Sequence, residues 1–420
     1  MDATSSDTQT AAQTATQAGP MVAPILYAVG PGDAAAYFRN RRDGRLPAFH
    51  TALAFSYQFF EAFGRKGHPL YILSWCGRAE RLAFGEHVIE NLPRHPAYFR
   101  GGLWHHLEQV VYGLRVVVRA RRFGARTVIV DSGTTHWIVL ALLSLFRVPV
   151  VAVLFNALWA AGYRPTTGLH RLIEWTDGWF FRHCVAAVLP MSPEIERQIV
   201  AVSGGRPHGP QFLFAPLYRR EFFERIPGPP PWDQRPFRVL YLGRVERYKG
   251  VFDVLTMAET LDRETPDGYR WRIVGEGSDF DALASEVARR NLSHLVSVEH
   301  NMASEEIALA TLGWSHANIV PTRHEFKEGL AMTAVEAILT NRPVVLTEVV
   351  PAWEVLPGAC LKAPTDDVPA LTDAMRRLAT DRELYQRLSQ ACRPLQATYY
   401  DPEAGLAGAL GRALRAIGRG

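Results

Sequence analysis

A buried strand, a polar loop, a helix and a second buried strand follow one another between residues 317 and 346. Ala317 to Val320 is a short apolar run of the kind that forms a fully buried strand. About eleven helix-forming residues begin at Leu330, and they end where Asn341 suits the left-handed residue that closes a helix. Pro343 cannot continue the helix, and a second apolar run follows it directly. Such a unit predicts a parallel sheet flanked by helices, with ligands bound where the strands end.

Two carboxylates lie in the loop and helix of this unit. Glu328 stands where the loop meets the helix, and Glu336 lies eight residues later on the second turn. Gly329 allows a ligand to approach the backbone closely, and the unpaired amides at the start of the helix attract a phosphate. A phosphate at the helix start, with carboxylates to accept hydroxyl protons, suits a sugar nucleotide. A capping glutamate followed by a solvated one is the structural alternative.

Length and composition indicate an ordinary globular protein of two or three domains. The chain has 420 residues, of which 48% are hydrophobic and 21% charged, and its net charge is +4. This mildly basic balance suits anionic small molecules or a membrane surface, and the sequence contains no nucleic-acid recognition motif. The cysteines have no metal-binding spacing and favour a reduced, cytoplasmic setting; they are Cys76, Cys184, Cys360 and Cys392.

The N-terminal tail and the apolar runs predict neither a signal peptide nor a membrane span. Residues 1–20 are rich in Ala, Thr, Gln and Ser, without a basic start or an apolar block, and are expected to form a disordered tail. The strongest candidate for a span, Trp137 to Ala161, is interrupted by Arg147 and Pro149. We interpret it as a buried helix followed by a strand, Val148 to Phe155.

Strands and helices alternate along most of the chain, which indicates doubly wound parallel sheets. Residues 21–225 form the first predicted domain, and the proline-rich residues 226–236 form a linker. A second domain, residues 237–396, begins with a strand from Arg238 to Leu242, and residues 397–420 form a last helical segment. In the first domain the clearest strands are Ile25–Val29, Leu70–Trp75 and Thr127–Asp131, and the clearest helices are Pro47–Phe63 and Leu103–Phe123.

A glycine-rich turn follows the first predicted strand. Gly30, Gly32 and Ala35 have the G-x-G-x-x-A spacing of a dinucleotide-binding loop. Pro31 lies inside this motif, and no acidic residue ends a second strand about 20 residues later, so we favour a loop that faces a cleft. The dinucleotide alternative would make the protein an NAD-dependent oxidoreductase.

The helix near residues 107–123 has two kinds of surface. Apolar residues recur at helical spacing from Leu107 to Val118, and Arg115, Arg119 and Arg122 recur on another face. Two interpretations remain open: peripheral contact with an anionic membrane, and a solvated face.

Two cations and three glycines lie at strand ends in residues 237–396. Gly243 permits a tight exit from the first strand, and Arg244 and Lys249 follow in the same loop. Arginine offers a planar fork to phosphate oxygens. The turn from Gly275 to Gly277 frees further backbone amides after the next strand. A charged surface turn is the alternative for the cation loop by itself.

Three ordered motifs resemble those of the family-4 retaining glycosyltransferases of GT-B fold. They are Gly243-Arg-Val-Glu-Arg-Tyr-Lys-Gly250, Ile273-Val-Gly-Glu-Gly277 and Glu328-Gly-Leu-Ala-Met-Thr-Ala-Val-Glu336. The resemblance covers residues 237–395 well and the N-terminal half only in its layout. It implies an α/β fold with two doubly wound, Rossmann-like parallel-sheet domains that face a cleft, the first on the acceptor side and the second binding the donor. Residues 397–420 then resemble the crossover helix that returns to the first domain.

The resemblance also implies roles for individual residues. Arg244 and Lys249 match cations that bind the donor diphosphate, Glu328 matches the acid that holds the hydroxyls of the donor sugar, and Glu336 matches the ribose-binding acid. The glycines Gly243, Gly275 and Gly277 belong to the same donor motifs, and the amides expected to bind sugar or phosphate are those near Gly329, Leu330, Ala331 and Met332. Leu330-Ala331 replaces the commoner Phe-Gly.

One residue departs from the family pattern on the N-terminal side. Asn156 stands where the family often has a histidine that contacts the donor sugar. Asn156 itself or His136, which follows the end of a predicted strand, is the candidate replacement. A capping or buried polar role is the alternative for His136.

The expected reaction transfers a glycosyl group from a UDP- or GDP-linked sugar to an acceptor with retention of configuration. A carbohydrate, such as a polysaccharide intermediate, and a lipid-linked molecule are the candidate acceptors. No cofactor and no metal ion are expected, because two cations and a helix start lie where the diphosphate binds, and Asp366-Asp367 lack the Asp-x-Asp spacing. The alternatives are a nucleotide-sugar epimerase, the NAD-dependent oxidoreductase, and a silent sugar-nucleotide-binding partner. The expected location is the cytoplasm. If the basic helix contacts a membrane, the enzyme is expected at the inner face of that membrane.

Overall fold

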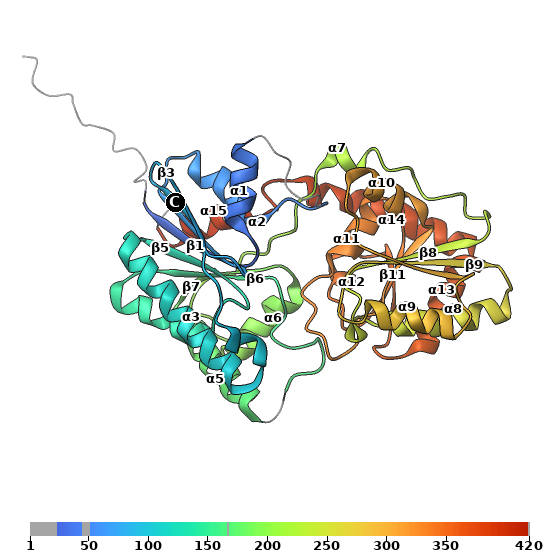
Figure 1. The fold of residues 1–420 in the computed structure, drawn as a ribbon, viewed down its shortest axis with the longest axis horizontal. Helices are drawn as coiled ribbons and strands as arrows, with labels where there is room; N and C mark the ends of the chain where they lie inside the picture. Colours follow the sequence, from blue (N-terminus) through green and yellow to red (C-terminus); the bar gives the residue numbers. More distant parts are fainter. Residues whose placement is uncertain (1–22, 44–50, 166–167, 419–420) are drawn as a thin grey trace, which may run out of the picture.

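In the computed structural model, which describes residues 23–43, 51–165 and 168–418, the chain forms two sheets flanked by helices (Figure 1). The expected tail, residues 1–20, lies outside the described residues. Both sheets extend in two directions from a central pair of strands, which are β1 and β5 in the first sheet and β8 and β11 in the second. The prediction of two doubly wound α/β sheets is confirmed, and ligand sites of such sheets lie beyond the ends of the central strands.

The first sheet has seven strands in the order β3-β4-β2-β1-β5-β6-β7. All neighbouring strands are parallel except β3 and β4, which form an antiparallel edge. Strands β5 and β6 are buried along their whole length, as expected for a sheet that helices cover on both faces. The strands are β1 (Ile25–Pro31), β2 (Leu70–Trp75), β3 (Glu80–Phe84), β4 (His87–Asn91), β5 (Thr127–Asp131), β6 (Val150–Leu154) and β7 (Val185–Pro190).

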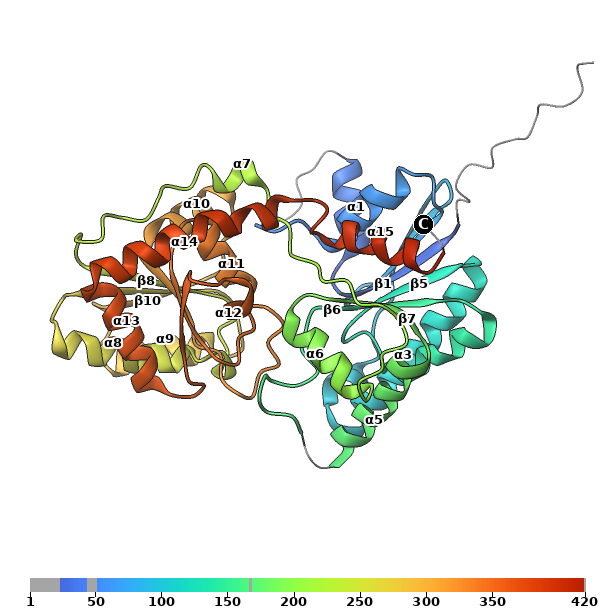
Figure 2. The same ribbon diagram turned by 180° about the vertical axis from the view of Figure 1, so that it is seen from behind.

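Helices cover both faces of this sheet. Figures 1 and 2 show α1, α2 and α15 on one face, and α3 and α5 on the other. The last helix, α15, follows the second sheet in sequence but packs against α2 and β7 of the first. The helical segments are α1 (Ala34–Arg42), α2 (Phe55–Phe59), η1 (Phe60–Gly64), η2 (Pro96–Arg100), α3 (Gly102–Phe123), α4 (Trp137–Leu140), η3 (Ala141–Phe146), α5 (Gly168–His183), α6 (Pro193–Val202) and α15 (Leu406–Ala416).

The second sheet has six parallel strands in the order β10-β9-β8-β11-β12-β13. The strands are β8 (Phe237–Leu242), β9 (Tyr269–Val274), β10 (Val296–Glu299), β11 (Ala317–Val320), β12 (Val344–Thr347) and β13 (Cys360–Ala363). The helical segments here and in the preceding connection are α7 (Arg220–Phe223), η4 (Arg247–Lys249), α8 (Val251–Glu264), α9 (Phe280–Arg289), α10 (Glu305–Trp314), α11 (Met332–Leu339), α12 (Ala352–Val355), α13 (Val368–Thr380) and α14 (Arg382–Tyr400).

The strand–loop–helix–strand unit has nearly the predicted bounds. Strand β11 spans Ala317–Val320 as predicted, and Asn341 has the predicted left-handed backbone, with φ of 59°. Helix α11 begins at Met332 rather than at Leu330. Its start is displaced because Ala331 has φ of 67°, which a right-handed helix does not allow.

Other local predictions were wrong. The helix expected over Pro47–Phe63 is reduced to α2 and the π-helical turn η1, and residues 44–50 lie outside the described part of the chain. The helix expected from Trp137 is the single turn α4 followed by the 3-10 turn η3. The β3–β4 hairpin was not predicted, because β3 is largely exposed and therefore lacks an apolar run. Within the described ranges, no helix is both long enough and apolar enough to cross a bilayer.

A buried arginine joins the proline-rich connection to the second sheet. Arg342 is 0% exposed, and burial lowers its pKa to about 10, so it keeps its charge at neutral pH. Its guanidinium donates only to backbone carbonyls, which are those of Ser315 (2.8 Å), Thr340 (2.7 Å), Gly313 (2.7 Å), Pro227 (3.2 Å) and Gly228 (3.4 Å). The side chain therefore ties the residues before β8 to the loop before β11.

We expect Arg342→Met to lower the free energy of unfolding by about 3 kcal/mol, because it leaves several buried carbonyls without a donor. Arg376→Met is the matched control, since the partly exposed Arg376 pairs with Glu264 and its loss should cost at most about 1 kcal/mol. Urea unfolding followed by circular dichroism measures both. Equal losses in the two variants would contradict this role of Arg342.

Candidate active site

The loops after β8, β9 and β11 lie side by side, because these strands are neighbours in the second sheet. The loop after β8 contains Arg244 and Lys249, and the loop after β11 contains Glu328. Glycine brings the two loops together: a Cβ on Gly250, which has φ of 75°, would lie 2.0 Å from the carbonyl oxygen of Pro321. The structure therefore places the predicted cations and the first predicted carboxylate beside the central pair of strands, where a ligand site is expected.

Lys249 and Glu328 form a largely buried ion pair. The hydroxyl of Thr322 also donates to the Glu328 carboxylate, at 3.2 Å. Burial lowers the pKa of Lys249, and the negative charge of Glu328 opposes this effect. The ammonium group also lies 3.9 Å from the centre of the Phe326 ring, so both the Glu328 carboxylate and the aromatic ring stabilise its charge.

Arg244 lies on the same aromatic pair but has a different electrostatic environment. Tyr248 and Phe326 stack with ring centres 5.1 Å apart, and the Arg244 guanidinium lies 4.8 Å from the centre of the Phe326 ring. Arg244 also donates to the Tyr248 hydroxyl, at 3.3 Å. Its side chain is exposed, and none of the ion pairs found among the described residues includes it. An exposed arginine that is oriented but lacks a carboxylate partner suits an anionic ligand.

The two glycines of the second motif have a packing role. A Cβ on Gly275 would lie 1.7 Å from the carbonyl oxygen of Gly243, and one on Gly277 would lie 2.1 Å from that of Val245. Gly243, with φ of 153°, donates its own amide to Val274 at 3.0 Å. The turns after β8 and β9 are thus in direct backbone contact, which requires glycine whether or not a ligand is present.

Glu336 is the most enclosed of the predicted charged site residues. It lies on α11, is 5% exposed, and accepts a hydrogen bond from the hydroxyl of Thr51 in the N-terminal half. Burial raises the pKa of Glu336 to about 7, and the Thr51 bond partly opposes this shift. The hydroxyl of Tyr218, also before the second sheet, donates to the backbone oxygen of Met332 at 3.3 Å. The start of α11 is therefore held by residues of the other half of the chain.

Gly329 lies directly against the N-terminal half of the chain. A Cβ there would lie 1.7 Å from the carbonyl oxygen of Phe155 and 3.2 Å from the Cα of Asn156. The exposed Asn156 therefore lies beside the loop after β11. The neighbouring Leu330 is 2% exposed and contributes to a cavity of about 570 Å³ between the halves. None of the cations or carboxylates named above lines that cavity.

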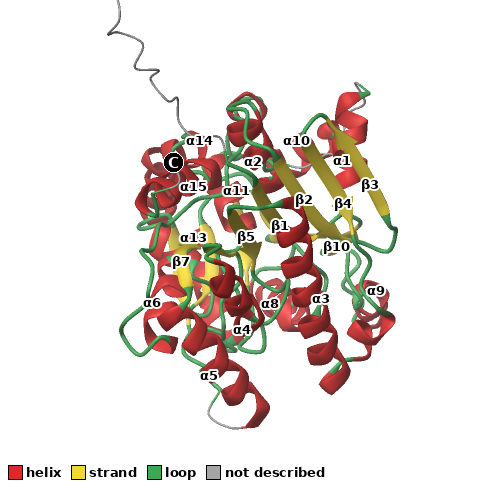
Figure 3. Cartoon of the chain, turned by 90° about the vertical axis from the view of Figure 1, so that its left-hand side faces the viewer, coloured by secondary structure: helices red, strands yellow, loops and turns green. Residues whose placement is uncertain are grey.

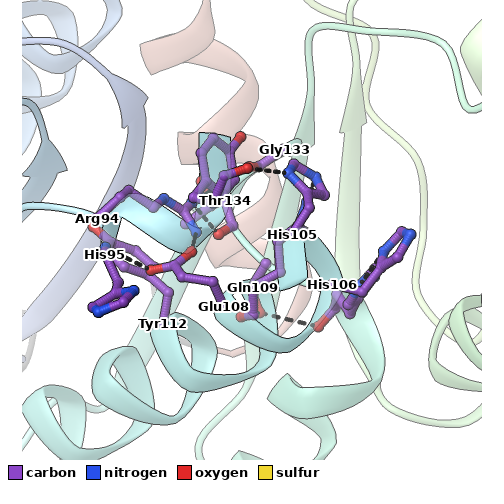
Figure 4. A network of polar contacts seen from close by, with 12 residues as sticks. Arg94, His95, His105, His106, Glu108, Gln109, Tyr112, Gly133 and Thr134 are labelled. Carbon is purple, nitrogen blue, oxygen red and sulfur yellow. Dashed lines mark hydrogen bonds and ion pairs between the residues drawn. The ribbon is translucent and has the colours of Figure 1, made fainter. Parts of the chain in front are cut away.

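His136 belongs to a different group of contacts. Its Nε2 lies 3.1 Å from Nδ1 of His106 on α3, and the two rings stack. Burial lowers the pKa of His136 to about 4, and the neighbouring histidines add to the shift, so its imidazole is neutral at physiological pH. The loop that contains it is fixed by Arg94, which donates to the carbonyl oxygen of Thr134 and pairs with Glu108 at 2.8 Å (Figure 4).

The predicted glycine turn begins within β1, since Gly30 belongs to that strand, and its backbone amides are hydrogen-bonded to other parts of the protein. The Gly30 amide donates to the carboxylate of Asp131 at 3.1 Å, and the Gly32 amide donates to the backbone of Trp75 at 3.0 Å. Burial raises the pKa of Asp131 to about 7. Because both amides already have acceptors, the geometry does not favour the dinucleotide alternative.

Several contacts at the site were not predicted from the sequence. Tyr248 and Phe326 could have been noticed as aromatic residues inside the cation and carboxylate loops, whereas Thr51 and Thr322 have no recognisable signal. Asp366, which lies outside the three motifs in the sequence, contacts the loop after β11. It is hydrogen-bonded to His324, and together with Glu325 these residues form an exposed group of potential metal ligands in the described part of the chain.

Part of the chain matches a known protein family. Residues 222–394 match the family described as glycosyl transferases group 1. The chain is 27% identical over 274 residues to an α-D-kanosaminyltransferase of Streptomyces kanamyceticus, an alignment that covers 61% of this chain and 68% of the relative. It is also 27% identical over 168 residues to a glycogen synthase of Mycobacterium tuberculosis, covering 40% of this chain and 39% of that protein.

Solved structures of low sequence identity share the fold over nearly the whole chain. An α,α-trehalose 6-phosphate synthase of Burkholderia multivorans is 13% identical with a TM-score of 0.71, covering 95% of this chain and 99% of that one. HepE of Anabaena, solved in complex with UDP, is 13% identical with a TM-score of 0.64, covering 93% and 99%. These findings assign residues 222–394 to the group 1 (family 4) glycosyltransferases, which are nucleotide-sugar-dependent, retaining enzymes, and show that nearly the whole chain has the GT-B fold.

Proposed function

We propose that residues 237–396 bind a UDP-sugar and that residues 21–225 hold a carbohydrate or lipid-linked acceptor. The observation that carries the donor assignment is the exposed Arg244 beside the buried Lys249–Glu328 pair, at the ends of two central strands. The UDP bound by HepE, which shares the fold, supports UDP as the first donor nucleotide to test, with GDP as the alternative. Binding of each nucleotide to the intact protein, measured by calorimetry, tests the assignment.

The proposed diphosphate site combines two side-chain cations. Arg244 offers a planar fork to the phosphate oxygens, and Lys249 adds a compact charge at the base of the site. The start of α11, whose first amides have no partner within the helix, directly follows the loop that contains Glu328 and adds positive partial charge. Glycine at 243, 275 and 277 contributes by packing the surrounding turns, so we assign these residues a supporting role.

The two carboxylates bind different parts of the donor in this proposal: Glu328 binds the sugar and Glu336 binds the ribose. Glu328 already accepts hydrogen bonds from Lys249 and Thr322. A carboxylate can accept more than two hydrogen bonds, so a sugar hydroxyl can also donate to Glu328. Glu336 accepts a hydrogen bond from Thr51, and we propose that a ribose hydroxyl replaces the Thr51 hydroxyl when the donor binds. Both changes keep each carboxylate hydrogen-bonded, which its burial requires.

In the proposed reaction, the acceptor oxygen bonds to the anomeric carbon on the face from which the diphosphate departs. The bond between that carbon and the phosphate oxygen breaks, and the acceptor proton passes to the departing diphosphate. Negative charge grows on the diphosphate as the bond breaks, so Arg244 and Lys249 stabilise the transition state more than the bound donor. Asn156, beside Gly329, is placed to contact the donor sugar from the N-terminal half.

We also propose that the enzyme works in a reducing compartment at an anionic membrane. All four cysteines are free, which fits a reducing setting, and the mildly basic balance fits an anionic surface. A lipid-linked acceptor would be reached from such a surface.

We expect Lys249→Met to slow sugar transfer by about a hundredfold, because a desolvated charge on the leaving group is lost. Arg247→Met is the matched control from the same turn, since Arg247 lies over Phe252 and pairs with Asp279 instead of Glu328. Steady-state transfer assays with both variants, after confirming their melting temperatures, measure the effect. Near-normal transfer by folded Lys249→Met would contradict the assignment.

We expect transfer to continue after exhaustive EDTA treatment, because two protein cations can offset the diphosphate charge without an ion. The assay compares treated enzyme with and without added magnesium or manganese. Activity that EDTA abolishes and a metal restores would contradict this mechanism. In that case Asp366→Asn would show whether the group of His324, Glu325 and Asp366 holds the ion.

We expect the affinity for a non-hydrolysable UDP-sugar to rise about tenfold between pH 6 and pH 8. The pKa of Glu336 is raised to about 7, so its carboxylate, the form that accepts ribose hydroxyl bonds, dominates only above that pH. The diphosphate diester of this ligand does not titrate in the range. Calorimetry across the range measures the effect.

Two variants control this pH dependence. Glu336→Gln cannot titrate, so its affinity should be low and independent of pH between 6 and 8. Glu328→Gln removes the other carboxylate, and it should weaken binding of the UDP-sugar while keeping the pH dependence and the affinity for free uridine. A pH dependence that persists in Glu336→Gln would refute the ribose assignment.

A further inference from the structure

Exposed apolar side chains are concentrated on one part of the N-terminal half. Among the described residues, nineteen large hydrophobic side chains are exposed, and thirteen of them lie on α3, η3 and α5. These three segments contain only about a tenth of the chain. The thirteen residues, called the apolar surface below, are Leu103, Trp104, Leu107, Val111, Leu114 and Val118 on α3, Leu142, Leu145 and Phe146 on η3, and Leu169, Leu172, Trp175 and Trp179 on α5.

The segments that carry the apolar surface lie close to one another around α4. Its residues on α3 and on α5 recur every three or four positions, so each helix presents them along one stripe. Helix α4 packs against both α3 and α5, and Figure 3 shows the three lying next to one another on the same side of the molecule. The Arg121 guanidinium lies 4.1 Å from the centre of the Phe146 ring, which joins the end of α3 to η3.

These apolar side chains are not needed for the core. The opposite face of α3 buries Tyr112, Val116 and Ala120 against the sheet, and that of α5 buries Phe180 and Phe181. Both helices therefore have an apolar face on each side. A helix of a water-exposed protein usually has a polar outer face, and an extended apolar one marks a docking site.

The charge of this region favours an anionic partner. Residues 94–190 contain eleven arginines, no lysine and four acidic residues, a net charge of +7, whereas the whole chain has +4 and the remainder therefore −3. Glu108, Asp131 and Asp177 are buried, and Glu174 pairs with Arg164. The exposed arginines around the apolar surface include Arg121, Arg122, Arg126, Arg147 and Arg182.

Only some of the arginines in the predicted stripe on α3 are available to a partner. Arg119 makes two hydrogen bonds to Glu90, at 2.8 and 3.0 Å, so its guanidinium is already paired with a residue of the first sheet. Arg122 is exposed, and Arg115 is partly buried. The apolar residues, which the sequence did not show to be exposed, therefore provide most of the contact area.

We propose that the apolar surface docks the enzyme on a bilayer that contains anionic lipids. Tryptophans 104, 175 and 179 have the amphipathic ring that favours the membrane–water interface, and the arginines meet the lipid phosphates. A second copy of the chain fits less well, because a symmetric contact would bring two regions of +7 together. Since the structure has no helix that could span a bilayer in its described ranges, the attachment is peripheral.

The docked orientation places the acceptor side near the lipid. Helices of a doubly wound sheet begin at the edge where the strands end, so the first turns of α3 and α5 lie at the edge that carries the site. His106, on the second turn of α3, contacts His136 in the loop after β5, and Tyr163, before α5, lies 5.1 Å from His324 in the donor half. This orientation rests on the proposed function and identifies the acceptor as a lipid-linked molecule.

Vesicle flotation without any substrate tests the docking. Wild-type protein should float with vesicles of equal phosphatidylglycerol and phosphatidylcholine, and less with pure phosphatidylcholine. The double variant Leu145→Glu/Trp175→Glu should bind the vesicles at least about tenfold less. Each change replaces an apolar contact with a negative charge, which the anionic lipid repels. These side chains are 76% and 69% exposed, so the changes should not disturb folding.

The matched control is Val200→Glu/Ile307→Glu, which changes two exposed apolar residues outside the apolar surface and should float like the wild type. Failure of the wild type to float, or equal loss in both double variants, would overturn the proposal. Dimerisation in sedimentation velocity that Leu145→Glu abolishes, without flotation, would assign the surface to a second copy and also overturn it. UDP binding by calorimetry stays a separate readout, so failure of the donor assignment is distinguishable from failure of docking.

Discussion

The candidate site depends on backbone contacts that only glycine allows. At Gly250, Gly275, Gly277 and Gly329, a carbonyl oxygen of another loop occupies almost the position that a Cβ would take. Three of these contacts join loops of the second sheet, and the fourth joins the loop after β11 to Phe155 of the first half. The glycines of the motifs are therefore explained by packing between loops, which in turn sets the positions of the charged side chains.

The charges at the site are partly neutralised and partly left open. Lys249 and Glu328 compensate each other in a largely buried position, which avoids the cost of an unpaired buried charge. Arg244 is held by the Tyr248–Phe326 stack, and its exposed guanidinium can accept an anion without breaking an ion pair. Glu336 differs from both, because among the described residues a hydroxyl donates to its carboxylate but no cation pairs with it, and burial therefore moves its pKa towards neutrality.

Helix α3 of the N-terminal half is held on its inner side by a buried ion pair and carries exposed apolar residues on its outer side. The buried Arg94–Glu108 pair, with the Tyr112 ring 4.0 Å from the guanidinium, fixes the start of α3 against the loop that carries His136. The outer side of the same helix carries six residues of the apolar surface. Rigid attachment of α3 means that an orientation imposed on its outer face is transmitted to the loops at the boundary between the halves.

The sequence by itself determined the alternation of strands and helices, the bounds of β5 and β11, the left-handed Asn341 and the residues of the three donor motifs. These features are local, because backbone preference and hydrophobic period act over a few neighbouring residues. The tertiary structure alone decided that Thr51 bonds to Glu336, that Arg119 pairs with Glu90, and that Leu107, Val111 and Leu114 face outward. An apolar stripe has the same spacing whether it meets a core or a lipid, so only the position of the sheet shows which face of α3 is buried.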